Sequence, residues 1–248
     1  KLDKIHTSMS LNKKKLEIRK KELFDIDGTL LAMDMEAFQN IYFRGLCKSL
    51  PEFEPKKLVE YIWKGTASMV KGGLETNRER FADTFTKLSG MDYYKNEDRF
   101  IKYYETDFQK CKEVCPITDT SKNIVNTLRD KGYLVAIATN PIFPQIATYS
   151  RINWIGLDPK SFPLVTTFEN SKNCKPNLEY YKDVLNALNI KAEETVMIGN
   201  DVLEDGIASK LGIKVILISD CLLNPNNLPT ENFEVYTLEE LYQGIKNL

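Results

Sequence analysis

Histidine is nearly absent from this sequence: His6 is the single histidine in 248 residues. It lies in a polar N-terminal stretch, far from any apolar pattern that predicts a buried site. Because catalytic triads and histidine-ligated zinc sites need imidazole groups, the sequence disfavours both classes of site. Any catalysis by this chain must therefore depend on carboxylates and lysine.

Long apolar runs, a signal-peptide pattern and paired cysteines are also missing. No run approaches the length of a membrane span, and the five cysteines form no C-x-x-C pair. Cys111 and Cys115 lie one helical turn apart, but no histidine is near them to complete a metal site. The five cysteines are typical of scattered, reduced thiols, and we expect a cytoplasmic protein with no membrane partner.

The sequence also lacks an excess of either charge. The formal net charge is −1, which gives no reason to expect nucleic acid or a membrane surface as a partner. The densest basic run, LNKKKLEIRK, belongs to residues 1–20, and we interpret this segment as a solvated N-terminal extension or short helix. A nucleic-acid-binding tail is the less favoured interpretation. The sequence says nothing about the oligomeric state.

Residues 35–114 show apolar side chains at intervals of three and four, which is the period of amphipathic helices. Pro51, Pro55, Gly72, Gly73 and Gly90 interrupt the pattern, so we predict four helices that form a separate small bundle. Its aromatic residues are most simply the core of that bundle, and a pocket lined by some of them is the alternative; they are Phe38, Tyr42, Phe81, Phe85, Tyr103 and Tyr104. We expect four positive side chains to be solvated, although one of them could reach an anionic substrate: Arg44, Lys71, Arg78 and Arg80.

From residue 115 onward, short apolar runs alternate with helical patterns. We predict strands near 133–140, 164–167, 195–201 and 214–219, and helices over 119–130, 144–153, 176–188 and 203–211, before a last short strand and helix. This alternation, with a first strand near 22–26, predicts an α/β fold with a doubly wound parallel sheet. The predicted domains are the extension, residues 1–20; the Rossmann-like core, residues 21–34 and 115–248; and the inserted helical domain, residues 35–114.

The segment from Glu22 to Leu31 reads ELFDIDGTLL and places two aspartates, Asp25 and Asp27, at the end of the first predicted strand. Open α/β sheets bind ligands at the carboxyl ends of their strands. Clustered carboxylates repel each other unless a cation compensates, and their hard oxygens suit Mg²⁺. An ordinary strand-to-turn junction is the competing interpretation, because Asp-Gly is a common turn signal.

Other polar residues follow later predicted strands or precede a helix: Thr139, Asn140, Lys175, Asp201 and Asp205. A parallel sheet brings its strand ends to one edge, so we expect these side chains to converge with Asp25 and Asp27. A hydroxyl, a lysine and several carboxylates are the groups that phosphoryl transfer requires. Taken one at a time, they also fit a helix cap, a solvated loop lysine and a capping pair of acids.

Four motifs in order, FDIDGTL, ATN, KP and GNDVLED, make residues 21–218 resemble the haloacid dehalogenase-like (HAD) hydrolase superfamily. The resemblance implies a Rossmann-like core and a helical cap inserted after the first motif. It further implies a magnesium-dependent phosphatase that hydrolyses a small phosphorylated metabolite through an aspartyl-phosphate intermediate.

The resemblance also implies a role for each matching residue. Asp25 matches the nucleophile and Asp27 the general acid and base. Thr139 and Asn140 match the phosphate-binding site, where Lys175 offsets negative charge. The implied magnesium site comprises Asp25, Asp27 through its backbone carbonyl, Asp201 and Asp205, the last either through water or as a partner of Lys175.

Two departures from the family pattern bear on these roles. Asn200 stands where many members have an aspartate, so metal binding by Asp201 depends on its spacing to Asp205. The first strand has few apolar residues, which suggests a distorted sheet edge near Asp25. A phosphomutase of the same superfamily and a non-catalytic binding protein with the same fold remain alternatives. Dehalogenation is disfavoured, because the position of Asp27 is not acidic in that branch.

Overall fold

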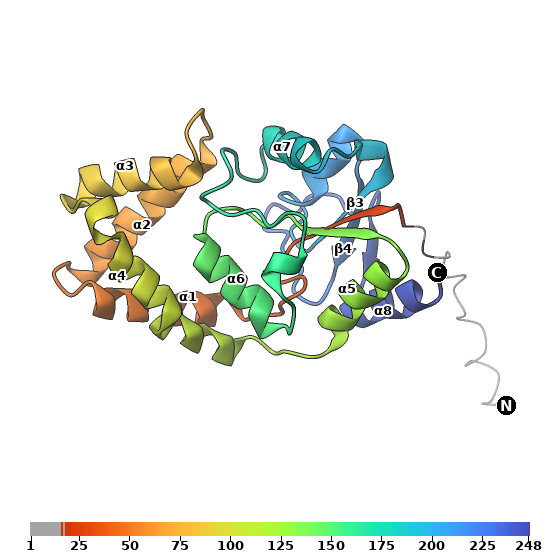
Figure 1. Ribbon diagram of the computed structural model, residues 1–248, viewed down its shortest axis with the longest axis horizontal. Coiled ribbons are helices and arrows are strands. Elements are labelled where there is room, and N and C mark those ends of the chain that lie inside the picture. The colour runs from red at the N-terminus through yellow and green to blue at the C-terminus, as the bar shows by residue number, and fades with distance from the viewer. Residues whose placement is uncertain (1–15, 17) are drawn as a thin grey trace.

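The computed structural model describes Leu16 and residues 18–248 (Figure 1). Most of the predicted N-terminal extension, residues 1–20, lies outside the described residues. The described end of that segment is only partly solvated: Lys20 is exposed, but Leu16 is buried and the Arg19 guanidinium donates to three backbone carbonyls. These carbonyls belong to Ala192, Thr195 and Gly212, at distances of 2.7–3.2 Å. Leu16 and Arg19 therefore attach this end of the segment to the α/β part.

A five-stranded parallel sheet forms the centre of the α/β part, in the order β2-β1-β3-β4-β5. The strands are β1 (Lys21–Phe24), β2 (Leu134–Ile137), β3 (Thr195–Gly199), β4 (Lys214–Ile218) and β5 (Glu234–Tyr236). Phe24 is in register with Ile137 on one side and Ile198 on the other, so the ends of the three strands are aligned. The expectation of a distorted edge near Asp25 is therefore wrong: β1 is paired on both sides. The sequence misleads here because a carboxylate, Glu22, is fully buried within this strand.

Helices cover both faces of the sheet, which confirms the predicted doubly wound α/β fold (Figure 1). Side chains at alternate strand positions enter different apolar clusters: Phe24, for example, belongs to one and Leu23 to the other. Helices α5 (Thr120–Asp130) and α8 (Leu238–Lys246) supply the first cluster. Helix α7 (Leu178–Leu188) and the 3-10 helix η4 (Gly206–Leu211) supply the second. Burial on both faces explains why β2, β3 and β4 are almost continuously apolar.

Three predicted elements differ from those observed. The strand expected at 164–167 is reduced to one bridge between Val165 and Ile137. The helix expected from residue 176 begins at Leu178, because the Asn177 side chain caps it and Pro176 precedes the cap. The helix expected from residue 203 is only η4, because the Asp201 carboxylate accepts the backbone N–H groups of the two residues at 203 and 204 and holds a turn there. The remaining short elements are α6 (Gln145–Trp154), η2 (Pro159–Ser161) and η3 (Ala192–Glu194).

A helical insertion lies between β1 and α5 and occupies the left part of Figure 1. It consists of α1 (Met35–Ser49), α2 (Pro55–Val70), α3 (Asn77–Ser89), α4 (Tyr93–Glu105) and the 3-10 helix η1 (Asp107–Val114). Asp34, Thr76 and Asp92 cap three of these helices through their side chains. The backbone N–H of Asp34 donates to the carbonyl of Val114 at 3.2 Å, so the chain leaves and re-enters the α/β part at adjacent points. That the insertion is a separate domain stays a prediction.

The insertion contacts the α/β part on two sides. At the start of α3, the backbone N–H of Asn77 donates to Ser171 and its buried carboxamide donates to the Pro141 carbonyl, at 2.8 and 3.0 Å. On the other side, the Trp154 indole of α6 donates to the Gln109 side chain at 2.8 Å. A cavity lies between these contacts, where the aligned strand ends face the helices of the insertion.

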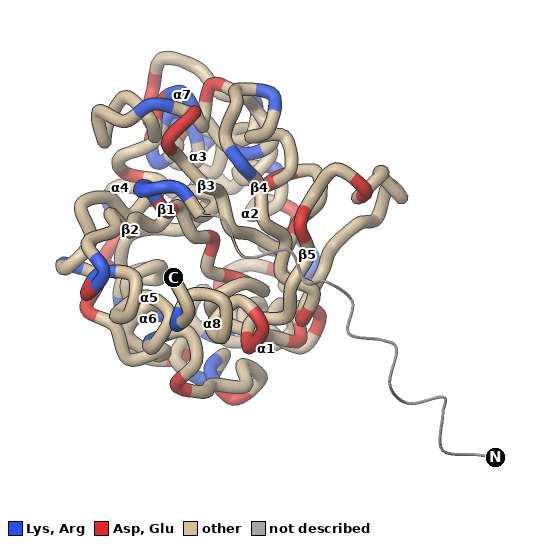
Figure 2. Tube along the Cα trace, turned by 90° about the vertical axis from the view of Figure 1, so that its right-hand side faces the viewer, with Lys and Arg blue, Asp and Glu red and all other residues tan. Residues whose placement is uncertain are grey.

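Two features of the described residues concern membranes and charge. Within the described part of the chain, no helix is both long and apolar enough to cross a membrane. Basic and acidic residues are interspersed along the chain in Figure 2. This distribution agrees with the formal net charge of −1.

Candidate active site

The turn after β1 carries the two predicted aspartates and is fixed to the neighbouring strand. The backbone N–H of Asp25 donates to the Ile198 carbonyl at 2.9 Å, which continues the pairing of β1 with β3 by one residue. Gly28 then has a φ of +79°, and a Cβ atom there would lie 2.2 Å from the Asn200 amide nitrogen. Glycine is therefore required on two grounds, the left-handed backbone conformation and the close approach of Asn200.

Asn200, the departure from the family pattern, has a structural role. Its side-chain oxygen accepts from the Thr29 hydroxyl at 3.1 Å, and its side-chain nitrogen donates to the Cys221 carbonyl at 2.9 Å. These bonds join the loop after β1 to the loops after β3 and β4. Asn200 thereby holds Asp201 and the Asp25 turn next to each other at one edge of the sheet.

Lys175 lies between two predicted site residues and is almost completely buried. Its ammonium is 2.6 Å from an Asp205 carboxylate oxygen and 3.4 Å from an Asp25 oxygen. Burial by itself lowers the pKa of a lysine, but the carboxylates of Asp205 and Asp25 hold the pKa of Lys175 well above its ordinary value. Lys175 is therefore a permanent positive charge beside Asp25.

Asp205 is the most firmly held acid of the group. One of its oxygens accepts a hydrogen bond from the Lys175 ammonium. The other accepts hydrogen bonds from the backbone N–H groups of Asn200 and Asp201, both at 3.0 Å. Gly199 leaves room for this carboxylate, because a Cβ atom at Gly199 would lie 2.1 Å from an Asp205 oxygen. Both oxygens are in use, so this geometry fits a partner of Lys175 better than a direct metal ligand.

Thr139 and Asn140 follow β2 and approach the same place. The Asn140 side chain accepts the backbone N–H of Lys175 at 3.1 Å and donates to Glu204 at 3.4 Å. The backbone carbonyl of Thr139 is held by the hydroxyl groups of Thr166 and Tyr180 at 2.7 and 2.8 Å. The structure thus brings the sequence-predicted residues from four loops to one edge of the sheet, as the alignment of the strand ends requires.

Sequence reasoning missed Arg151, a fully buried residue of α6. Its guanidinium donates to Asp27 Oδ2 and to the Thr148 hydroxyl, and it lies over the Phe143 ring at 4.5 Å from the centroid. The other oxygen of Asp27 is buried and has no hydrogen-bond partner among the described residues. An arginine on the otherwise apolar face of a predicted helix is the signal that could have identified this residue.

Glu204, which sequence reasoning also left out, lines the same cavity as Asp25, Asp27 and Asp201. Burial raises the pKa of Glu204 to about 7 and that of Asp25 to about 7, in the latter case against the lowering effect of Lys175. Burial also raises the pKa of Asp201. A bound cation would lower these values and keep the carboxylates ionised at neutral pH.

The carboxylates that face the cavity fit a magnesium ion better than a metal that needs a complete protein cage. Within the described chain, no three acidic, histidine or cysteine side chains are grouped so as to hold a metal by themselves. Mg²⁺ is usually held by one or two carboxylates together with waters and substrate oxygens, so it does not need such a group. Asp25 and Asp201 line the cavity and supply oxygens of the type that Mg²⁺ prefers.

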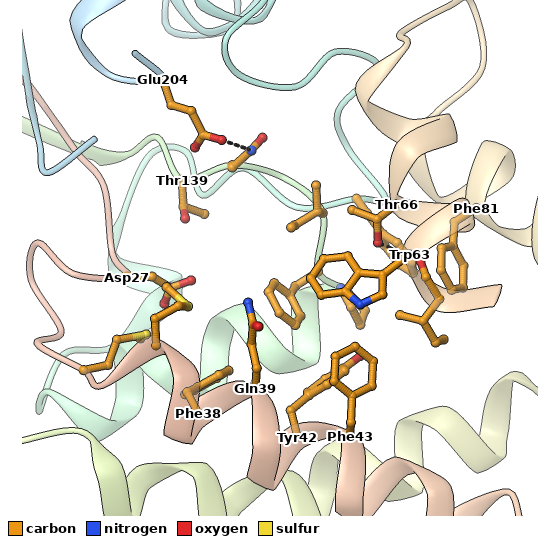
Figure 3. A pocket seen from close by; sticks show the side chains of 18 of the residues that line it. Asp27, Phe38, Gln39, Tyr42, Phe43, Trp63, Thr66, Phe81, Thr139 and Glu204 are labelled. Carbon is orange, nitrogen blue, oxygen red and sulfur yellow. Dashed lines mark hydrogen bonds between the residues drawn. The ribbon is translucent and has the colours of Figure 1, made fainter. Parts of the chain in front are cut away.

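The cavity has a polar end and an aromatic end. Figure 3 shows Asp27, Thr139 and Glu204 on the left, and Tyr42, Phe43, Trp63 and Phe81 of the insertion at the lower centre and right, with Phe38 below Asp27. Four of the six aromatic residues expected to form the bundle core therefore also line this cavity: Phe38, Tyr42, Phe81 and Tyr104. The aromatic wall corrects the expectation that they serve only the bundle.

Comparisons with known proteins show which sequences and structures are similar to this chain. The family model for haloacid dehalogenase-like hydrolases matches residues 23–218. A pyrophosphatase, PpaX of Halalkalibacterium halodurans, is 24% identical over 203 residues, which are 79% of this chain and 81% of that protein. A glyceraldehyde 3-phosphate phosphatase of Methanocaldococcus jannaschii is 26% identical over 200 residues, 73% of this chain and 86% of the relative.

Solved structures show the same fold. The HAD-hydrolase YfnB of Bacillus subtilis, in a magnesium-bound form, aligns with this chain at a TM-score of 0.56 and 22% identity. The alignment covers 92% of this chain and 99% of the YfnB chain. CbbY from Rhodobacter sphaeroides, in complex with phosphate, aligns with this chain at a TM-score of 0.56 and 13% identity. The alignment covers 92% of this chain and 100% of the CbbY chain. At these identities the comparisons with solved structures show the fold alone.

Proposed function

This chain belongs to the haloacid dehalogenase-like hydrolase family, and from that membership we propose that it is a magnesium-dependent phosphatase. Its substrate is a small phosphorylated metabolite, and the reaction passes through an aspartyl-phosphate on Asp25. The similarity to relatives named as phosphatases and pyrophosphatases supports the hydrolysis of phosphate compounds. The cluster of Asp25, Lys175 and Asp205 at the strand ends is the observation that carries the proposal.

Asp25 is the proposed nucleophile. Its carboxylate attacks the phosphorus atom, an O–P bond forms to Asp25, and the bond between phosphorus and the alcohol oxygen breaks. Lys175, 3.4 Å from Asp25, reduces the repulsion between this carboxylate and the phosphate dianion. Asp205 in turn holds Lys175 in position and is a positioning residue.

Asp27 is the proposed general acid and base. It gives its proton to the leaving alcohol oxygen, and in the second step it takes a proton from the water that attacks the aspartyl-phosphate. This second step releases phosphate and restores the Asp25 carboxylate. Because Arg151 donates to one oxygen of Asp27, the other oxygen remains available for the proton.

The phosphate group is held, in this proposal, by the Thr139 hydroxyl, the Asn140 backbone and the Lys175 ammonium. The Asp25 and Asp201 carboxylates and the Asp27 backbone carbonyl would hold Mg²⁺. When bound, Mg²⁺ supplies positive charge that offsets the phosphate and keeps Asp25 ionised. Asp205 contributes through Lys175 or through water rather than directly. The magnesium-bound form of the fold relative YfnB supports this choice of metal.

The test is the hydrolysis of p-nitrophenyl phosphate with and without Mg²⁺, for the wild type and for Asp25→Asn. We expect activity only with Mg²⁺, and loss of turnover to background in the variant, because it lacks the anionic nucleophile. Asp98→Asn is the matched control, since Asp98 is an exposed acid of α4 and should leave activity unchanged. A variant at Asp25 that keeps a tenth of the wild-type rate would remove this residue from the nucleophile role.

A second measurement addresses the intermediate. Acid-quenched mass spectrometry of Asp27→Asn, mixed with p-nitrophenyl phosphate, should show a phosphoryl group on the peptide that contains Asp25. It should accumulate because the variant lacks the base that activates water. Absence of the phosphoryl group from that peptide would contradict the covalent route.

Measurement of released phosphate separates hydrolysis from phosphomutase activity, which returns the phosphoryl group to a sugar.

A further inference from the structure

The aromatic end of the cavity is built mainly by the helical insertion. The cavity has a volume of about 370 Å³, which falls within the range of small-molecule sites. Phe43 and Trp63 lie on one part of its wall, with ring centroids 5.6 Å apart. Phe143, from the loop before α6, completes the wall on the side of the α/β part. The space beyond the phosphate position is thus enclosed by rings from both parts of the chain.

This wall carries no charge. Among the cavity-lining residues that the insertion supplies, none is lysine, arginine, aspartate or glutamate. The cations expected to be candidates for an anionic substrate lie elsewhere: Arg78 forms a two-fold hydrogen bond with Glu97, and Arg80 donates to backbone carbonyls. Arg44 and Lys71 are exposed and do not line the cavity. A second anionic group on the substrate would therefore find no cation at this end.

The tyrosines of the wall are neutral as well. The hydroxyl groups of Tyr42 and Tyr104 are 2.9 Å apart and form a hydrogen bond with each other. Burial raises the pKa of Tyr42 to about 12 and raises that of Tyr104 as well, so both remain protonated at neutral pH. The wall is consequently uncharged over the whole pH range in which the carboxylates of the site work.

Trp63 and Gln39 are the two wall residues with unused binding capacity. Trp63 is 47% exposed although it lies on the cavity, and its indole N–H donates to no acceptor in the described chain. The Gln39 carboxamide points into the cavity in Figure 3 and forms no hydrogen bond with any described residue. An occupant with an apolar ring and at most a few neutral polar groups would cover the indole and pair with the carboxamide.

We propose, resting on the proposed phosphatase function, that the substrate is a phosphate monoester of an uncharged alcohol that is aromatic or otherwise apolar. The phosphate lies at Asp25, Thr139 and Lys175, and the alcohol lies against Trp63 and Phe43. A pyrophosphate or bisphosphate would place its second anion against rings without a cation, where desolvation is not compensated. The site therefore differs in specificity from a pyrophosphatase or a sugar-bisphosphate enzyme.

The test compares esters of aliphatic alcohols, which have similar leaving groups, and adds pyrophosphate, an anhydride with a better leaving group, as the alternative with a second anionic group. The panel contains 2-phenylethyl phosphate, ethyl phosphate, glyceraldehyde 3-phosphate, pyrophosphate and phosphocholine. We expect kcat/KM for the phenylethyl ester to exceed each of the others by about tenfold or more, the scale that one buried ring contributes. Trp63→Ala should remove most of the preference over ethyl phosphate. Tyr94→Ala is the matched control, because Tyr94 is 50% exposed and does not line the cavity.

Preference for pyrophosphate, glyceraldehyde 3-phosphate or phosphocholine, or an unchanged preference in Trp63→Ala, would overturn the inference while leaving the phosphatase function standing. A titration of tryptophan fluorescence with the unreactive 2-phenylethylphosphonate separates the two failures. The chain has two tryptophans, and Trp154 is buried, so we expect a blue shift that disappears in Trp63→Phe. Binding without hydrolysis of any ester would contradict the proposed function, whereas hydrolysis without this fluorescence change would contradict the aromatic site.

Discussion

Replacing Lys175 by methionine should destabilise the protein strongly, independently of any effect on catalysis. Both Lys175 and Asp205 have side chains that are 1% exposed, and Asp25 is 11% exposed by the same measure. Methionine fills a similar volume but leaves two carboxylates without their nearest cation. Asp205 keeps its two hydrogen bonds from the backbone of Asn200 and Asp201, which moderate the loss.

Removal of one partner from a buried ion pair costs about 3–5 kcal/mol, because the other charge remains buried and unpaired. A domain of this kind has a total unfolding free energy of about 5–15 kcal/mol, so the variant should lose a large fraction of its stability. We therefore expect the unfolding free energy of Lys175→Met to fall by about 3 kcal/mol or more in EDTA. Added Mg²⁺ should restore part of it, since a cation beside Asp25 takes over part of the role of the lost ammonium.

The assay is urea denaturation followed by circular dichroism. Lys182→Met is the control, because its ion pair with Glu179 at 2.8 Å is about half exposed and should contribute less than about 1 kcal/mol. The double variant Lys175→Met/Asp205→Asn removes the stranded charge and should be less destabilised than Lys175→Met by itself. If the single variant at Lys175 unfolds within about 1 kcal/mol of the wild type, the assigned role of the buried pair is incorrect.

Three further predictions concern other charged groups. Glu22→Gln should become increasingly more stable than the wild type as pH rises above about 4.5. Burial raises the pKa of Glu22 well above its ordinary value, so the carboxyl ionises in the unfolded chain while it stays protonated in the folded one, and the wild type loses stability. Denaturation at pH 5 and pH 8 tests this, and a difference that does not depend on pH would contradict it. Asp27→Asn should lower kcat by roughly two to four decades for alkyl phosphates and by less for aryl phosphates, because aryl leaving groups need less protonation. Equal losses for the two classes in steady-state assays would count against Asp27 as a general acid. Arg151→Met should lower kcat with little change in KM, and it should shift the pH profile of kcat, because Arg151 orients Asp27 rather than the substrate. A change confined to KM would contradict that role.

The convergence of Asp25, Lys175 and Asp205 could be predicted because it depends on topology. Parallel strands place their carboxyl ends at one edge, and each residue follows a strand or precedes a helix by only a few positions. Apolar periodicity was equally sufficient for the helices of the insertion, where Asp34, Thr76 and Asp92 supply their caps. The helices follow from local sequence, and the convergence follows from the parallel topology that the alternating pattern predicts.

Features that depend on tertiary packing could not be predicted in the same way. A glutamate such as Glu22 is typical of an exposed edge strand, yet Glu22 is buried in a strand that is paired on both sides. Arg151 reaches Asp27 across 124 positions of the chain, and no local pattern specifies that contact. The aromatic residues of the insertion had the correct period for a helical core. Whether they also face an open space depends on how the insertion docks, through Asn77 on one side and Gln109 on the other.

The hydrogen bond between Asp34 and Val114 bears on how the sequence of the helical insertion can evolve. Since the chain departs and returns at one place, we expect the register of the sheet to tolerate changes in the length of residues 35–114. Exchange of the whole segment must preserve the contacts of Asn77 with Ser171 and Cys174, because these residues closely precede Lys175. If the alcohol binds as we propose, its recognition depends mainly on residues 35–114 and cleavage depends on the α/β part, so we expect that a new specificity can arise without a new catalytic apparatus.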